Sequence, residues 1–223
     1  MHHQGNMSAE MKSRWNIDDF GWMKESNESY NKRWISKYGL DENIRELDQL
    51  EGEGLDISDS EHHQIGWLRN IDRLMDMLPI ELPPSSCRLI DVGCGSGVST
   101  LYLADNYAFS SFTGIDFSDS LIRTAKKNQK RLADFNSSLK PISFEKSDAR
   151  EYLLPHHKHL VYMFNPFGFQ TAEKFISNNL EVFRETSSIL AIAWDTWIAE
   201  LSQKRLHKSI LRNGFYKLSL VFF

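Results

Sequence analysis

The chain has 223 residues, of which 41% are hydrophobic and 25% charged, a composition typical of a folded domain rather than a disordered chain. The net charge of −4 leaves no basic surplus of the kind that nucleic-acid-binding proteins carry, and no apolar run is long enough to cross a bilayer. The two cysteines are too few for a disulfide framework, and the N-terminus lacks the apolar core of a signal peptide. We therefore expect a cytoplasmic protein that binds neither nucleic acid nor membrane.

Charge is unevenly spread along the chain. Residues 41–61 carry nine acidic residues against Arg45 alone, a local charge of −8 that leaves +4 for the rest. The basic cluster at 123–132 is typical of the solvated face of a helix, with phosphate-backbone binding as the alternative.

Residues 1–60 are predicted to be a separate unit, an aromatic-rich helical extension made of about two short helices. Trp22, Tyr30 and Trp34 could form a lid that contacts a substrate and excludes water. The alternative is that these aromatic side chains pack as core and only stabilise the domain. Residues 61–223 are predicted to form the ligand-binding domain.

A helix is predicted over residues 61–78, with Ser60 as its N-cap and prolines 83 and 84 beyond its end. It presents one apolar stripe, formed by Ile65, Leu68, Ile71, Leu74, Met75 and Leu78.

From residue 88 onward, strand and helix patterns alternate. This alternation predicts an α/β fold with a doubly wound, mostly parallel sheet. Helices are expected over 98–107, for about 16 residues after an N-cap at Ser118, and from a cap at Thr171 to about Phe183. The strands are expected at 88–92, 111–116, 141–146, 159–164 and 187–194.

The C-terminus allows two interpretations. Asn213-Gly214 is a strong hairpin signal, and the alternation that follows at 217–220 favours an antiparallel final strand. The alternative is a helix through Leu211 that Gly214 ends, followed by a single strand.

Three glycines follow the first strand at alternate positions, Gly93, Gly95 and Gly97. A glycine turn between a strand and a helix brings backbone N–H groups close to an anionic or nucleotide ligand. The dinucleotide fingerprint would need glycine at position 98, where Val98 stands, and no Gly-Lys-Ser/Thr follows for a phosphate-binding loop. A nicotinamide-dependent oxidoreductase is therefore disfavoured.

The pattern Asp91-x-Gly93-x-Gly95-x-Gly97 resembles the signature of class I S-adenosylmethionine (SAM) dependent methyltransferases, over about residues 85–223. Two further positions match that family. Asp116 ends the second strand, where the resemblance implies that it binds both ribose hydroxyls, and Asp148 follows the third strand, where the family reads the adenine amino group.

The resemblance implies SAM as cofactor and S-adenosylhomocysteine (SAH) as product, with no metal. Phe117 would lie against the adenine ring. Asp91 could instead only anchor the loop, and Cys94 fits a small filler better than a nucleophile. The cofactor-binding residues implied are Asp91, Gly93, Cys94, Gly95, Gly97, Asp116, Phe117, Ser147, Asp148, Ala149 and Asn165.

Asn165-Pro166-Phe167-Gly168 follows the fourth strand, at the edge of the sheet where ligands bind. It resembles in part the (D/N)-P-P-(Y/F) motif of amino-group methyltransferases, which makes Asn165 a candidate catalytic residue and Phe167 a candidate substrate contact. The alternative is an Asn-Pro turn with Phe167 in the core.

Two other groups of polar residues are candidates for a role in the site. Asp195 follows the fifth strand at the same edge, as a candidate base or as a solvent-facing loop acid. His156, His157 and His159 precede the fourth strand, at the opposite edge, and are expected to be exposed loop residues rather than metal ligands.

The sequence thus predicts a methyltransferase that moves the methyl group of SAM to a nitrogen or oxygen of a small-molecule or saccharide-type acceptor. Three alternatives stay open: a non-catalytic SAM-binding module, an amino-group methyltransferase acting on protein or nucleobase through Asn165–Gly168, and a relative that transfers an aminopropyl group.

Overall fold

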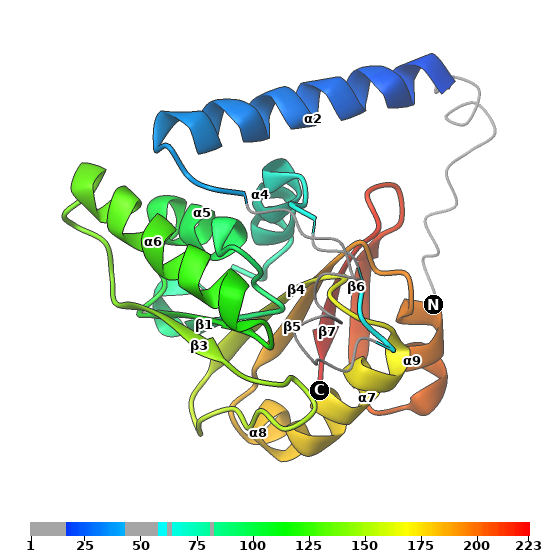
Figure 1. Ribbon diagram of the computed structural model, residues 1–223. Helices are drawn as coiled ribbons and strands as arrows, with labels where there is room; N and C mark the ends of the chain where they lie inside the picture. The colour runs from blue at the N-terminus through cyan, green and yellow to red at the C-terminus, as the bar shows by residue number, and fades with distance from the viewer. Residues whose placement is uncertain (1–16, 43–57, 62–63, 81–82) are drawn as a thin grey trace.

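The computed structural model describes residues 17–42, 58–61, 64–80 and 83–223, with side chains from residue 23 onward. In these ranges the strands form one sheet in the order β3-β2-β1-β4-β5-β7-β6 (Figure 1). β1 to β5 pair in parallel, while β7 runs antiparallel to both β5 and β6. The predicted α/β doubly wound sheet with an antiparallel C-terminal strand is confirmed. Its strands are β1 (Arg88–Val92), β2 (Phe112–Asp116), β3 (Ile142–Lys146), β4 (His159–Phe164), β5 (Ile189–Ala193), β6 (Ser209–Asn213) and β7 (Leu218–Phe222).

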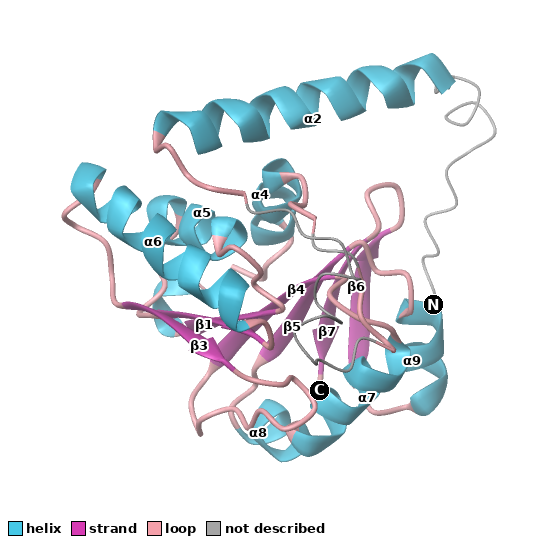
Figure 2. Cartoon of the chain, in the orientation of Figure 1, coloured by secondary structure: helices cyan, strands magenta, loops and turns pink. Residues whose placement is uncertain are grey.

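Helices cover both faces of the sheet (Figure 2). α4, α5 and α6 pack on one face with Leu89 of β1, and α7, α8 and α9 pack on the other with Ile90 and Val92. Because successive side chains of a strand point to opposite faces, a strand covered on both sides reads as continuously apolar. The helices are α2 (Ile17–Lys37), α4 (Leu68–Asp76), α5 (Val98–Asn106), α6 (Asp119–Phe135), α7 (Phe169–Asn178), α8 (Leu180–Glu185) and α9 (Ile198–Lys204), with a 3₁₀ turn at Pro84–Ser86.

The described part of the N-terminal extension differs from the prediction in the length of its helix. It is one 21-residue helix, α2, longer than the short helices expected, and it lies outside the layer that holds α4 and α5 (Figure 1). The helix predicted over 61–78 begins only at Leu68, after Trp67. Ser60 does not cap it, because Ser60 pairs with Phe167 in an isolated antiparallel bridge.

Two of the other predicted caps had different outcomes. Ser118 caps α6 as expected, since its hydroxyl accepts a hydrogen bond from the Leu121 N–H. The next helix begins at Phe169, ahead of Thr171, and is broken at Asn179 into α7 and α8. The amide of Asn179 is buried and bonds to the backbone of the 152–154 loop and to Phe175, which fixes the chain where the helix breaks.

His159 corrects another expectation. It is 1% exposed at the start of β4, and its Nε2 lies 2.8 Å from the carbonyl oxygen of Pro155. His156 is exposed and pairs with Glu185. No group of potential metal ligands occurs in the described part of the chain.

The C-terminal strands form the expected hairpin, with a four-residue turn at 214–217 rather than a two-residue Asn-Gly turn. Asn213 is the last residue of β6, and its side chain accepts a hydrogen bond from the Tyr216 N–H. None of the helices in the described ranges has the length and apolar character that a bilayer span requires.

Replacing Arg205 with glycine is expected to stabilise the protein by about 0.5–1 kcal/mol. Arg205 is exposed and ends α9 in the left-handed conformation (φ 53°), which glycine adopts without a Cβ penalty. Urea unfolding of the two proteins measures the difference. Gln203→Gly, two residues earlier within the helix, serves as the opposite control and should destabilise by about 1 kcal/mol. A loss of stability in both variants would contradict the prediction.

Candidate functional site

The glycine turn links β1 to α5, and all three of its glycines have positive φ, between 54° and 79°. A Cβ on Gly93 would lie 2.2 Å from Cβ of Pro166, and one on Gly97 would lie within 2.9 Å of Phe144 and Ala125. Two of the three glycines are therefore already required by internal packing. The sequence alone predicts that all three glycines serve the approach of a ligand, and the packing of Gly93 and Gly97 is an additional reason that only the structure shows.

Asp116 fastens this turn to the next loop. Its Oδ2 accepts a hydrogen bond from the Gly95 N–H and its Oδ1 accepts one from the Ser118 N–H, both at 2.9 Å. The carboxylate is 6% exposed and lies on the wall of the cavity described below. It is positioned by the ends of β2 and β1 together, since parallel strands end at the same edge of the sheet.

Asp91 lies deeper, at 2% exposure, and its carboxylate accepts a hydrogen bond of 2.5 Å from the Thr100 hydroxyl of α5. Burial raises the pKa of Asp91 to about 7, although the Thr100 hydrogen bond opposes the shift. Burial also raises the pKa of the Cys94 thiol well above its usual range, which makes this cysteine a poor nucleophile.

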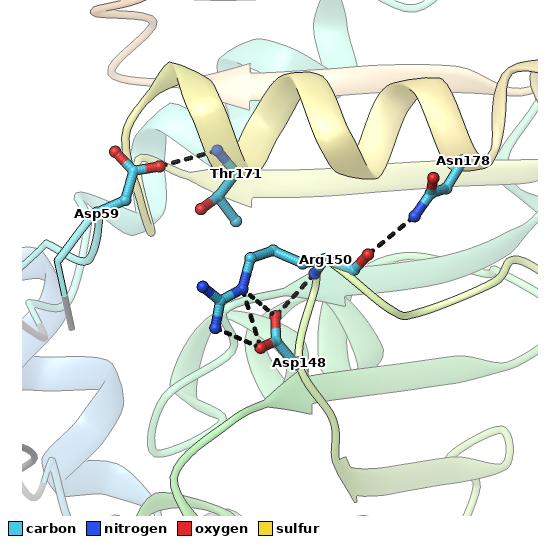
Figure 3. Close-up of polar contacts among 5 residues, drawn as sticks. All are labelled: Asp59, Asp148, Arg150, Thr171 and Asn178. Carbon is cyan, nitrogen blue, oxygen red and sulfur yellow. Dashed lines mark hydrogen bonds and ion pairs between the residues drawn. The ribbon is translucent and has the colours of Figure 1, made fainter. Parts of the chain in front are cut away.

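Asp148 follows β3 and forms an ion pair with Arg150 (Figure 3). The guanidinium Nη2 lies 2.6 Å from Asp148 Oδ2, and the Arg150 N–H donates to Oδ1 at 2.8 Å. Asn178, in the last turn of α7, donates to the carbonyl oxygen of Arg150. The loop after β3 is thus held in one geometry.

The loop after β4 has a strained start. Asn165 has φ of 37°, and its Oδ1 accepts a hydrogen bond of 2.8 Å from the Thr196 hydroxyl. A non-glycine residue in this region costs free energy and is held there by its surroundings. Pro166 packs against Gly93, and Phe167 is 7% exposed. The loop therefore contacts the glycine turn directly.

One cavity of about 570 Å³ joins these loops, a volume within the usual range for small-molecule sites. It brings together most of the residues expected from the sequence: Asp91, Gly93, Cys94, Asp116, Phe117, Ser147, Asp148, Ala149, Asn165 and Phe167. Gly95 and Gly97 belong to the same turn without lining the cavity.

Three expected residues lie elsewhere. Tyr30 bonds to the hydroxyl of Tyr102 at 2.7 Å, and Trp34 packs edge-on against Tyr102, so these side chains attach α2 to α5 instead of facing the cavity. Asp195 is 1% exposed and is bound by Arg212 and Ser219. These bonds anchor β5 to the hairpin. The side chain of Trp22 lies outside the described residues.

The sequence interpretation missed a polar wall on the other side of the cavity. It comes from α2 and from the chain before α4, with Arg150 and Trp194 nearby. Lys24, Glu28 and Asn31 are spaced so that they lie on one face of a helix, and this signal is present in the sequence. Nothing in the sequence indicates that residues 59–61 line a cavity. The missed residues include Lys24, Glu28, Asn31, Asp59, Ser60, Glu61, Gln64, Trp67, Ser96, Arg150 and Trp194.

Comparison with known proteins gives a family for the central part of the chain. Residues 89–190 match the family model described as a methyltransferase domain. An uncharacterised protein of Rickettsia prowazekii is 35% identical over 78 residues, which are 34% of this chain and 30% of that protein.

Solved structures with a similar fold have low identity. YjhP from Escherichia coli is 22% identical, with 61% of this chain and 53% of that chain covered and a TM-score of 0.41. Magnesium protoporphyrin IX methyltransferase from Synechocystis, with bound SAH, is 16% identical, with 73% and 88% covered and a TM-score of 0.47. The chain thus spans about a third of the rickettsial protein and about half of YjhP.

The matched segment runs from the second residue of β1 into β5 and contains the glycine turn, Asp116, Asp148 and the Asn165 loop. Residues 89–190 therefore match a methyltransferase domain, and the match covers a little under half of the chain.

Proposed function

We propose that this chain is an enzyme that transfers the methyl group of SAM to a nitrogen or oxygen of a small-molecule or saccharide-type acceptor. The observation that carries the proposal is the single cavity that the glycine turn, Asp116 and Asp148 share with the Asn165 loop and the polar wall. A donor and an acceptor bound in one cavity can be held in line for displacement at the sulfonium.

The donor half is supported by Asp116, the last residue of β2, and by Asp148, which follows the adjacent strand β3. Asp116 would accept hydrogen bonds from the ribose hydroxyls while it keeps the Gly95 N–H in place. Phe117 is half-buried beside it and would lie against the adenine ring.

The acceptor half is walled by α2, by residues 59–61 and 64–67, and by the Asn165 loop. Its charged side chains are Glu28, Asp59 and Glu61 against Lys24, whose Nζ lies 3.8 Å from Glu28. An anionic acceptor would meet this negative excess, so a neutral or cationic molecule fits better. A cavity of about 570 Å³ lined by these three segments favours a small molecule over a folded protein or a duplex.

The proposed machinery does not include Asp195, because two partners bind its carboxylate away from the cavity. Asn165 is retained as the residue that would contact donor and acceptor. Methyl transfer from a sulfonium needs positioning and a lone pair on the acceptor more than it needs a metal or a strong base.

The test has two steps. Calorimetry with SAH first measures donor binding, which we expect in the micromolar range. SAM with a radiolabelled methyl group is then incubated with polyols, sugars, amines, carboxylates, tRNA and protein fractions. Transfer to a neutral or cationic small molecule is the expected result. SAH binding without transfer to any of these acceptors would instead support a non-catalytic SAM-binding module, and transfer only to tRNA or protein would overturn the acceptor class.

A further inference from the structure

The chain before α4 is joined to the acceptor loop by its backbone. We define residues 58–61 as the strap. Asp59 accepts a hydrogen bond of 2.8 Å from the Gly168 N–H through its carbonyl oxygen, and the Glu61 N–H donates to the carbonyl oxygen of Pro166 at 3.2 Å. Between them, Ser60 and Phe167 form an antiparallel bridge. The strap is thus held beside the loop that follows β4 by one isolated antiparallel bridge and the two flanking backbone hydrogen bonds.

The side chain of Asp59 adds a second connection. Its Oδ2 accepts a hydrogen bond of 2.8 Å from the Thr171 N–H, in the first turn of α7 (Figure 3). Gly168, the residue before α7, supplies no side-chain cap. Asp59 therefore supplies the capping oxygen from more than a hundred residues away in the chain, and its negative charge also suits a helix N-terminus.

Gly168 leaves the space for this carboxylate. A Cβ on Gly168 would lie 2.1 Å from Asp59 Oδ1. The Asn165–Gly168 loop also contacts the glycine turn, because Pro166 fills the space that a Cβ on Gly93 would take. The connections therefore run from the strap through the Asn165–Gly168 loop to the glycine turn.

We propose that Asp59 is a positioning residue, which holds the strap against the Asn165–Gly168 loop and so sets the shape of both the acceptor wall and the donor turn. The inference rests on the proposed function of the cavity. The strap lies outside residues 89–190, so a segment beyond the matched domain completes the site. Acceptor selection would then depend on the segment before β1, including Glu61 and Gln64, which line the same cavity.

The experiment uses the full chain and SAH as the probe. In Asp59→Ala, SAH is expected to dissociate about fivefold faster in stopped-flow measurements, which corresponds to the usual cost of a lost helix cap. Amide hydrogen exchange should become faster at residues 58–61 and 167–171. Asp59→Asn keeps a capping oxygen. Its SAH dissociation rate and its amide exchange rates should therefore lie close to those of the original chain. Glu61→Ala changes an exposed side chain of the same strap and should leave exchange at Gly168 and Thr171 as in the original chain.

Gly168→Ala gives an independent check, because its Cβ would displace the Asp59 carboxylate. Its effect on SAH dissociation should resemble that of Asp59→Ala, and the double variant should show less than the product of the two effects. Faster exchange in α7 with an unchanged SAH dissociation rate in Asp59→Ala would make Asp59 a helix cap only, and would overturn the proposal. Effects of the two single variants that multiply in the double variant would also overturn it, because they would show that Asp59 and Gly168 act independently. Absence of SAH binding by the original chain would contradict the proposed function instead, while the exchange measurements would still test the strap.

Discussion

Replacing Asp116 with alanine is expected to weaken SAH binding by about a hundredfold or more. In the proposed complex the carboxylate accepts hydrogen bonds from the two ribose hydroxyls, and bonds to a charged acceptor contribute about 1.5–3 kcal/mol each. The same change releases the N–H groups of Gly95 and Ser118, which leaves the glycine turn without its fastening. Isothermal titration calorimetry measures the affinity directly.

Two variants separate binding from folding. Asp119→Ala removes an exposed carboxylate three residues along the chain, which pairs only with Arg123 among the contacts described, and it should leave the affinity unchanged. Asp116→Asn keeps an acceptor for one N–H but loses the charge, and it should bind SAH with intermediate affinity. Unchanged affinity in Asp116→Ala, at an unchanged melting temperature, would remove Asp116 from the cofactor site.

Replacing Asp91 with asparagine is expected to remove a large pH dependence of stability. The folded-state pKa of Asp91 is raised from 3.8 to about 7, chiefly because the carboxyl group is fully buried. The folded protein therefore binds a proton that the unfolded chain has released. The stability from this group is fully present below about pH 4 and is lost as the pH rises through 7.

Between pH 5 and pH 8, the free energy of unfolding of the original chain should fall by about 2.5 kcal/mol more than that of Asp91→Asn. Urea unfolding at several pH values gives both curves. Thr100→Val supplies a second test, because the Thr100 hydroxyl bond lowers the pKa of Asp91. Without that bond, the free energy of unfolding should continue to decline to a higher pH than in the original chain. Parallel curves for the original chain and Asp91→Asn would show that the pKa of Asp91 is not raised in the folded protein.

Much of the fold was predictable from local sequence. β1 and β4 match their predicted ranges, and the other predicted strands differ by one to three residues at their ends, because buried parallel strands read as short apolar runs between turn residues. The antiparallel C-terminal strand followed from the Asn213-Gly214 signal and the alternation after it. The donor side was also accessible, since a glycine turn and the acids that end neighbouring strands occupy fixed places in a doubly wound sheet.

The acceptor side was decided by tertiary packing. The aromatic residues Tyr30 and Trp34 face α5, and the polar face of the same helix, with Lys24 and Glu28, lines the cavity. Aromatic content alone could not assign these faces, because apolar rings gain more free energy against a core than beside a water-filled cavity.

Asp59 and Asp195 illustrate what only the folded chain decides. From the sequence, Asp195 is a better candidate for the site than Asp59, because it follows the carboxyl end of a strand. In the structure, however, its carboxylate is bound by Arg212 and Ser219 of the C-terminal hairpin. Asp59 stands in an acid-rich stretch without a pattern, yet it bonds to the backbone of Gly168 and Thr171. The strands themselves and the donor turn depend on short-range patterns that the sequence by itself determines. The roles of these two carboxylates depend on partners 17 to 112 residues away, and only the tertiary structure brings those partners together.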